Sequence, residues 1–314
     1  MLIPLLVGCA RYDGPTIQQV PFLFLGRGPA PDDSAVIDTA DTAIDSADTG
    51  DTPDPALTCW LGADRGWTTC ESTVPYDSSW GGDYTYPAPY DGSPQYALPT
   101  RFVDIDAIDA NESFAPNFAV NEYLESYKGR YGILQDHMTA HLQDVRDYIG
   151  GPLIINSGYR SPGYNAQIGG VEYSRHMYGD GADLQADGWT VEELGDACAA
   201  LGAGYVGLYE DGHTHCDWRD DPLDPAYFPA SRSAGPAPRP HTAARLVDRG
   251  GTWLAPASGF DEGEPFRRWT ARDRAGNVLD SANGREYAPP PGTALLEVRV
   301  GGGAIATARL PTAR

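Results

Sequence analysis

Two histidines, a cysteine and an aspartate lie within five residues of the segment GHTHCDWR. These residue types are common metal ligands, so the question is which of them could share one ion. Side chains alternate across a β-strand, and a strand here would place His213, His215 and Asp217 on one face and Cys216 on the other. Cys216 therefore does not bind the same metal ion as His215. It faces the side where a packed helix with Cys198 could lie.

A second group of metal-binding residue types lies upstream, in the segment SRHMYGDGADLQ. His176 precedes Asp183 by seven residues, and small residues between them are expected where a loop turns tightly into a strand. A neutral imidazole and a carboxylate held in this way suit Zn2+. The preceding loop, NSGYRSPGYNAQIGG, carries one cation, Arg160, whose planar guanidinium can bind a carboxylate or an oxyanion.

Apolar spacing predicts the elements that must position these motifs. Apolar residues recur every three or four positions before Gly150, and a Thr190–Glu193 capping box starts a second amphipathic helix. The short segments that follow the helices have the composition of strands, and a Glu-Asp-Gly turn joins the last two. We expect helices over residues 133–149 and 190–202 and strands over 153–155, 205–209 and 213–218.

His137 and His141 lie four residues apart on the first of these helices and could in principle chelate a metal ion. The apolar stripe beside them favours half-buried surface histidines instead. Metal binding by this pair is the less favoured alternative.

Four ordered motifs resemble the zinc D-Ala-D-Ala carboxypeptidase and murein endopeptidase family. They are SGYRSPGYN, the pair Gly169-Gly170, SRHMYGDGADL and GHTHCDWR, within roughly residues 117–219. This family shares a metallopeptidase group with lysostaphin-type endopeptidases and the Hedgehog signalling domain. The resemblance implies an α+β domain in which a small antiparallel sheet carries the zinc site, and it implies Zn2+ as the cofactor.

The resemblance also implies roles for individual residues. His176, Asp183 and His215 would hold Zn2+, and His213 would act on the water or the transition state. Three protein ligands leave a fourth position open, as in catalytic zinc sites, and zinc lowers the pKa of a water there towards about 7. An imidazole two residues from a ligand, on the same strand face, is close enough to transfer a proton.

Other residues would contact the substrate or support the site. By the same resemblance, Arg160 would contact a carboxylate or the developing oxyanion, and Ser174 would also touch substrate. Family members that cut free D-Ala-D-Ala dipeptide carry an acid where this chain has Gly212, so a dipeptidase is not predicted. Asp211 and Asp217 are possible replacements, and Asp217 is better suited to orient a histidine.

We therefore predict a zinc-dependent peptidoglycan peptidase that hydrolyses peptide bonds involving D-amino acids. It would act on stem peptides, as a D,D-carboxypeptidase or a crosslink endopeptidase. The alternative is a catalytically silent zinc-containing module that binds the cell wall. His213 and Arg160 favour the enzyme, because a binding module needs no acid–base group beside its metal ion.

Charge and hydropathy exclude other classes. The chain of 314 residues has a formal net charge of -22, and Lys128 is its single lysine. Nucleic-acid binding needs clustered lysine and arginine, so no nucleic-acid partner is expected. The sequence contains no apolar run of eighteen residues, the length that a membrane-spanning helix needs.

The N-terminal segment MLIPLLVGCA resembles a bacterial lipobox. Residues 1–9 would be a lipoprotein signal segment. Cleavage before Cys9 would make this cysteine the first residue, and it would then be acylated. The segment is short and lacks basic residues, which suggests a start further upstream; the alternative is an apolar terminus with an ordinary thiol. We expect an extracytoplasmic protein, lipid-anchored to the membrane in the bacterial cell envelope, in the periplasm or at the cell surface.

The cysteine count agrees with an oxidising compartment. The sequence has five cysteines, and an acylated Cys9 would leave four for two disulfides. Four cysteines allow three pairings. We favour Cys59 with Cys70 as a local loop and Cys198 with Cys216 inside the main domain.

Composition divides the N-terminal half. Residues 29–55 are rich in Asp, Thr, Ser, Ala and Pro and cannot bury enough apolar surface to fold, so we predict a disordered tether over residues 10–57. Residues 58–100 are rich in aromatic residues, Gly and Pro, which indicates a disulfide-stapled, loop-rich lead-in packed on the next domain. A glycan-binding surface is the alternative, because exposed Trp and Tyr stack on sugars.

The rest of the chain divides in the same way. The zinc peptidase domain is predicted over residues 101–225 and a linker over 226–240. Residues 241–314 alternate short apolar runs with Gly-rich turns, typical of a small β-sandwich. That domain could bind the cell wall or a partner protein, or it could only pack against the rest of the chain. His241, its one histidine, is expected to be polar surface.

Overall fold

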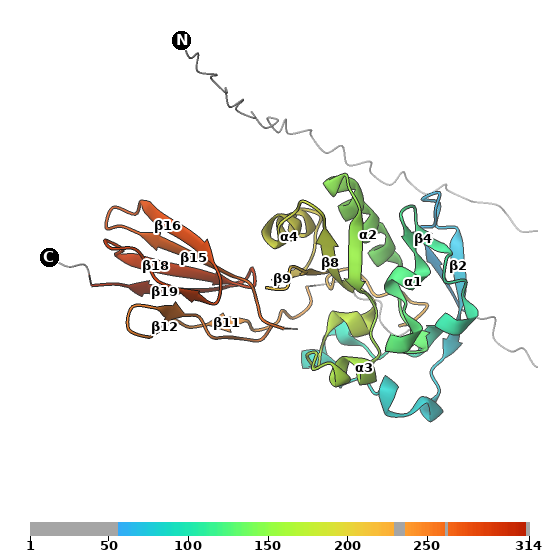
Figure 1. The fold of residues 1–314 in the computed structure, drawn as a ribbon. Helices are drawn as coiled ribbons and strands as arrows, with labels where there is room; N and C mark the ends of the chain where they lie inside the picture. The colour runs from blue at the N-terminus through green and yellow to red at the C-terminus, as the bar shows by residue number, and fades with distance from the viewer. Residues whose placement is uncertain (1–55, 229–235, 261–262, 312–314) are drawn as a thin grey trace, which may run out of the picture. The chain divides into compact units, whose positions relative to one another are not determined.

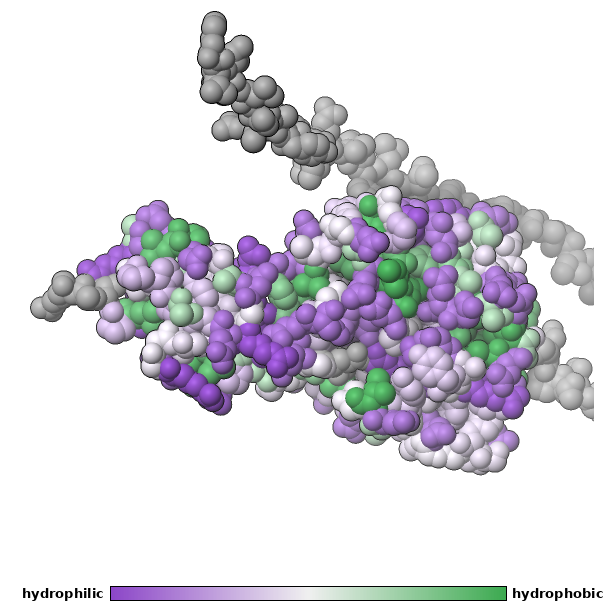
Figure 2. Space-filling view, viewed as in Figure 1, coloured by the Kyte–Doolittle hydropathy of each residue, from purple (hydrophilic) through white to green (hydrophobic). Residues whose placement is uncertain are grey.

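The computed structural model describes residues 56–228, 236–260 and 263–311 (Figure 1). The predicted signal segment with Cys9 and nearly all of the predicted tether lie outside these residues, as does part of the predicted linker. Within the described ranges, no helix combines the length and the apolar character that a membrane span requires. On the face shown in Figure 2, apolar surface forms small patches among hydrophilic residues.

The lead-in is less irregular than its composition predicts, because it contains two of the strands of an antiparallel sheet. The sheet has the order β1-β2-β3-β6, and the disulfide Cys59–Cys70 joins residues that face each other in the β1–β2 ladder. Its strands are β1 (Leu57–Trp60), β2 (Thr69–Pro75), β3 (Arg101–Asp104) and β6 (Tyr131–Gly132).

The lead-in also shares its core with the predicted peptidase domain. Trp60 is fully buried, and its indole N–H donates to the carbonyl of Leu134 at 2.9 Å. The ring of Trp80 stacks on Tyr131 with 3.6 Å between centroids. The predicted boundary at residue 100 therefore does not separate two hydrophobic cores.

The first predicted helix, α2, spans Asp136–Ile149 and begins three residues later than expected. The backbone N–H of Gln135 donates to the carbonyl of Gly179 at 3.1 Å, which ties this residue to the segment before β8. As predicted, the helix ends at Gly150, which is left-handed with φ of 65°.

A second antiparallel sheet, with the order β7-β8-β10-β9, follows the predicted strands closely. Helix α4 (Val191–Ala200) starts with the predicted capping box and carries Cys198, which is bonded to Cys216 of β10. The strands are β7 (Leu153–Ser157), β8 (Gly181–Ala186), β9 (Tyr205–Leu208) and β10 (Thr214–Asp217).

Short elements connect the two sheets. They are β4 (Ser113–Ala115), β5 (Phe118–Ala119), α1 (Val120–Tyr123), α3 (Pro162–Gln167) and the 3-10 turns Ser78–Tyr84, Tyr90–Gly92, Pro94–Tyr96, Ile105–Ala107, Ser126–Lys128 and Arg175–Tyr178.

The described C-terminal residues form strands around a core of their own, centred on Trp269. Their sheets have the orders β16-β15-β18-β19, β12-β13-β17 and β11-β14 (Figure 1). The strands are β11 (Ala243–Ala244), β12 (Val247–Asp248), β13 (Trp253–Leu254), β14 (Ala257–Ser258), β15 (Arg267–Arg272), β16 (Val278–Asn283), β17 (Glu286–Tyr287), β18 (Leu295–Val300) and β19 (Ala304–Arg309). A sandwich arrangement stays a prediction, and His241 is exposed.

These C-terminal strands belong to the same compact unit as both sheets, Thr52–Arg314. The backbone N–H of Phe266 donates to the carbonyl of Leu208 at 2.8 Å, and Tyr209 and Pro265 form an isolated bridge. The outer edge of β9 is covered at this point, so part of an edge strand is paired rather than open.

The buried disulfide can be tested against the more exposed one. We expect Cys198→Ser/Cys216→Ser to lower the free energy of unfolding by about 2–4 kcal/mol, through lost loop closure and two buried hydroxyl groups. Cys59→Ser/Cys70→Ser should cost less, because that bond closes a shorter loop, with a sequence separation of 11 against 18. Denaturant unfolding of both variants measures the difference, and an equal or reversed order would contradict it.

Candidate metal centre

Three residues from three different elements meet at the predicted metal site. Asp183 of β8 and His215 of β10 are direct partners in the ladder between these strands. His176 lies in the 3-10 turn Arg175–Tyr178, which Gly179 ends in a left-handed conformation with φ of 76°. A Cβ atom at Gly179 would lie 2.5 Å from the carbonyl oxygen of Ile133, so this turn requires glycine.

The ligand atoms of these residues converge. Nε2 of His176 lies 3.2 Å from Oδ1 of Asp183 and 3.1 Å from Nδ1 of His215, and that Nδ1 lies 3.1 Å from the same Oδ1. All three side chains are buried. Two imidazole nitrogens and one carboxylate oxygen form a donor set that suits Zn2+, and one metal position could satisfy all three atoms.

The outer nitrogen of each imidazole has a partner that fixes the ring. Nδ1 of His176 donates to the carbonyl of Gly158 at 2.7 Å, and Nε2 of His215 lies 3.1 Å from Oδ2 of Asp217. The contacts turn Nε2 of His176 and Nδ1 of His215 towards the centre. Asp217 thus lies where the sequence predicted an orienting residue.

Burial and neighbouring charges shift the pKa values of His176 and His215 in opposite directions. Burial and the nearby Arg160 lower the pKa of His176 to about 4. Burial would lower the pKa of His215 too, but hydrogen bonds to Asp183 and Asp217 raise it to about 10. The two histidines hold the pKa of the buried Asp183 well below its usual value.

His213 lies immediately beside this group. Its Nδ1 is 2.7 Å from Oδ1 of Asp211, its ring stacks on Tyr209 at 4.4 Å, and its Nε2 lies 3.8 Å from Oδ1 of Asp183. The imidazole is thus held on both sides with Nε2 near the ligand atoms. Asp211, a possible replacement for the missing acid, contacts His213 instead of the centre.

Arg160 and Ser174 also lie inside the protein. The guanidinium of Arg160 forms an ion pair with Oδ2 of Asp183, and its Nε donates to Oγ of Ser157 at 2.9 Å. In this structure Arg160 contacts the carboxylate of Asp183, a predicted metal ligand, and its contact with substrate stays a prediction. Oγ of Ser174 is buried and has no hydrogen-bond partner among the described residues.

The sequence did not indicate a supporting role for Lys128, which the structure places behind Arg160. The side chain of this single lysine is 4% exposed, and it pairs with Glu125. Its Nζ donates at 3.0 Å to Oγ of Ser157, the atom that also accepts from Arg160. A lone lysine in an arginine-rich chain is a compositional signal, but only the fold shows its partner.

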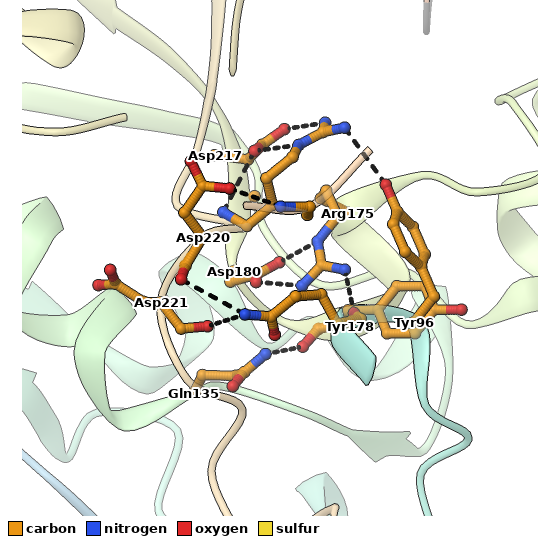
Figure 3. Close-up of polar contacts among 12 residues, drawn as sticks. Tyr96, Gln135, Arg175, Tyr178, Asp180, Asp217, Asp220 and Asp221 are labelled. Carbon is orange, nitrogen blue, oxygen red and sulfur yellow. Dashed lines mark hydrogen bonds and ion pairs between the residues drawn. The ribbon is translucent and has the colours of Figure 1, made fainter. Parts of the chain in front are cut away.

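A second missed group holds Asp217 from the other side (Figure 3). Arg219 forms an ion pair with Asp217, and its Nη1 donates to the hydroxyl of Tyr96 at 3.2 Å. Tyr96 comes from the lead-in, and the guanidinium of Arg175, paired with Asp180, lies 5.0 Å from its ring centroid. Residues of the lead-in therefore support the metal centre.

His137 and His141 do not take part in the centre. This agrees with the favoured prediction, in which they are half-buried histidines. Their side chains are 13% and 21% exposed. Nε2 of His141 lies 2.7 Å from Asp221, and its ring stacks on Trp218 at 4.7 Å. Among the described residues, the group around Asp183 is the one that could hold a metal ion.

Comparison with known proteins agrees with this arrangement. The family model described as Peptidase M15 matches residues 116–217. A zinc D-Ala-D-Ala carboxypeptidase from Streptomyces albus G is 40% identical over 81 residues, which are 24% of this chain and 31% of that relative. The chain thus spans about a third of the length of this curated relative. The matches confirm the family that the four motifs indicated.

Removing the lysine behind Arg160 should destabilise the protein. Lys128→Met leaves the partly buried Glu125 without its cation, and we expect a loss of about 1–3 kcal/mol in the free energy of unfolding. Arg130→Met is the control, because this arginine is 56% exposed and exposed pairs contribute about 0–1 kcal/mol. Denaturant unfolding compares the variants, and equal losses would contradict a supporting role for Lys128.

Removing the charge behind His215 should weaken metal binding. Asp217→Asn keeps the shape but loses the anionic partner of His215, and we expect Zn2+ affinity to fall roughly 10–100-fold. Competition with a chromogenic chelator measures this affinity. Asp221→Asn is the matched control, since Asp221 contacts His141 outside the centre. The role of Asp217 is wrong if both variants bind Zn2+ as tightly as the parent chain.

Proposed function

We propose that the chain is a zinc-dependent peptidase acting on peptidoglycan, because residues 116–217 match the family model described as Peptidase M15. It would hydrolyse peptide bonds that involve D-amino acids, at a terminal D-Ala or at a crosslink between stem peptides. The observation that carries the proposal is the convergence of two imidazole nitrogens and one carboxylate oxygen beside His213. The similarity to a D-Ala-D-Ala carboxypeptidase supports the substrate class.

His176, Asp183 and His215 would hold Zn2+ through the atoms that converge in the structure. When bound, Zn2+ would supply Lewis acidity, which polarises a carbonyl and lowers the pKa of a water molecule. His213 would accept a proton at Nε2 and return it to the leaving amine. The contact with Asp211 favours this role, because a carboxylate on Nδ1 fixes the orientation of the ring and leaves Nε2 facing the ligand atoms.

Arg160 would bind the carboxylate or developing oxyanion of the substrate. Its guanidinium already contacts Asp183, so a substrate oxygen bound to it would lie close to the metal ligands. The donors of arginine are planar and permanently charged, which suits both kinds of oxygen. Ser174, with its buried hydroxyl, would add a further contact.

We also propose that the protein works outside the cytoplasm, attached to the membrane through a lipid on Cys9. Two disulfides are present, Cys59–Cys70 and Cys198–Cys216, and such bonds persist in oxidising compartments. The lipobox motif supports the anchor, and the composition of residues 10–57 supports a tether that would let the domain reach the wall.

The activity can be tested on the zinc-loaded full chain. Digestion of pentapeptide and crosslinked muropeptides, followed by mass spectrometry, should show loss of terminal D-Ala or cleavage of the crosslink. We expect His213→Ala to lower kcat by about 10²–10⁴-fold while zinc content stays near one per chain. His215→Ala should lose both zinc and activity.

The control is His141→Gln, which changes a histidine away from the centre and should keep zinc and activity. Zinc bound without any product from the crosslinked or pentapeptide substrates would favour the alternative, a catalytically silent module that binds the wall. The described position of His213 argues against that alternative, because a silent module needs no imidazole held beside its ligands.

A further inference from the structure

Three tyrosines contribute to the lining of a pocket of about 290 Å³. Another lining residue, Arg219, is paired with Asp217, which contacts the outer nitrogen of His215. We call this cavity the tyrosine pocket and define it by Tyr90, Tyr96, Glu172, Tyr173, Arg219 and Arg239. Its volume is at the lower end of the range for small-ligand sites, which suits one ring-sized unit rather than a folded partner.

Two walls of the pocket continue into the metal-binding segments. Tyr173 precedes Ser174 and lies three residues before His176. The guanidinium of Arg219 forms an ion pair with Asp217, and Oδ2 of Asp217 lies 3.1 Å from Nε2 of His215. The half-buried ring of Tyr205 lies near both His215 and Arg219. Its centroid is 5.9 Å from the ring of His215 and 5.0 Å from the guanidinium of Arg219.

The lining combines ring surface with polar groups at the rim. Tyr90 and Tyr173 are half-buried and pack edge to face at 4.8 Å, with Tyr96 buried beneath them. Glu172 is exposed at the rim, and Arg239 is 40% exposed and paired with Asp220. Apolar faces flanked by hydrogen-bonding groups fit a flat ligand with an apolar face and polar edges, such as a pyranose sugar.

Charge narrows the class of ligand. The two arginines of the pocket, Arg219 and Arg239, are paired with Asp217 and Asp220. With the charges of these pairs balanced, the carboxylate of Glu172 at the rim and the net charge of -22 disfavour a nucleotide or another polyanion. A neutral ligand with many hydroxyl groups remains compatible with every residue of the pocket. The alternative interpretation of residues 58–100, a glycan-binding surface, also pointed to tyrosines of this segment.

We infer that the tyrosine pocket is a subsite for one sugar residue of the peptidoglycan glycan strand. The inference rests on the proposed function, because it places the sugar next to the peptide that is cut. The enzyme would thereby distinguish stem peptides attached to glycan from free peptides.

The inference can be tested by comparing two substrates with the same stem peptide. One substrate carries the attached disaccharide and the other has no sugar. With the zinc-loaded full chain, we expect the KM of the disaccharide substrate to be about five- to tenfold lower, the scale of one or two aromatic contacts. Tyr173→Ala should remove this difference and leave hydrolysis of the sugar-free peptide and the zinc content unchanged. Tyr173→Phe should retain it, because the ring face is kept.

Tyr148→Ala is the matched control, since this tyrosine is 57% exposed on α2 and does not line the pocket. Equal KM values for the two parent substrates would overturn the inference, as would a Tyr173→Ala variant that weakens both substrates equally. If neither substrate is cut, titration calorimetry with the peptide-free disaccharide still decides: binding that Tyr173→Ala abolishes supports the pocket, and no binding contradicts it.

Discussion

The carboxylate of Asp183 is the contact on which the centre depends. One of its oxygens faces His176 and His215, and the other is paired with Arg160. This residue is placed by the ladder between β8 and β10, where it is the direct partner of His215. Because all of these groups are buried, the loss of one partner would leave an uncompensated charge in a medium that solvates it poorly. The loss of any one partner would therefore weaken the whole site.

This requirement explains why distant segments are needed to build a small site. Asp217 behind His215 is held by Arg219, and Arg219 in turn by Tyr96 of the lead-in. On the opposite side, Lys128 and Arg160 share the hydroxyl of one serine. The lead-in thus supplies both core packing and support for the site. The lead-in therefore packs as part of the predicted peptidase domain rather than as a separate module.

Much of this arrangement can be predicted from local pattern. Strand alternation separates His215 from Cys216, and a capping box marks the start of α4. The family resemblance of the motifs implied His176 and Asp183 as the other candidate ligands. The rest cannot be predicted, because it depends on contacts between residues far apart in the sequence. Helix α2 starts late since Gln135 pairs with Gly179, and the partner of Tyr96 lies 123 residues away. No local pattern encodes such pairs.

The distribution of charge links the centre to its proposed chemistry. Around the two histidines, the cations Arg160 and Arg219 balance the anions Asp183 and Asp217. A zinc ion bound by neutral imidazoles would therefore add two positive charges without a compensating group from these residues. That excess would attract one anionic group, such as a hydroxide or a substrate carboxylate, while the net charge of -22 repels polyanions from the surface. A hydroxide bound in this way would suit the proposed hydrolysis, whether at a terminal residue or at a crosslink.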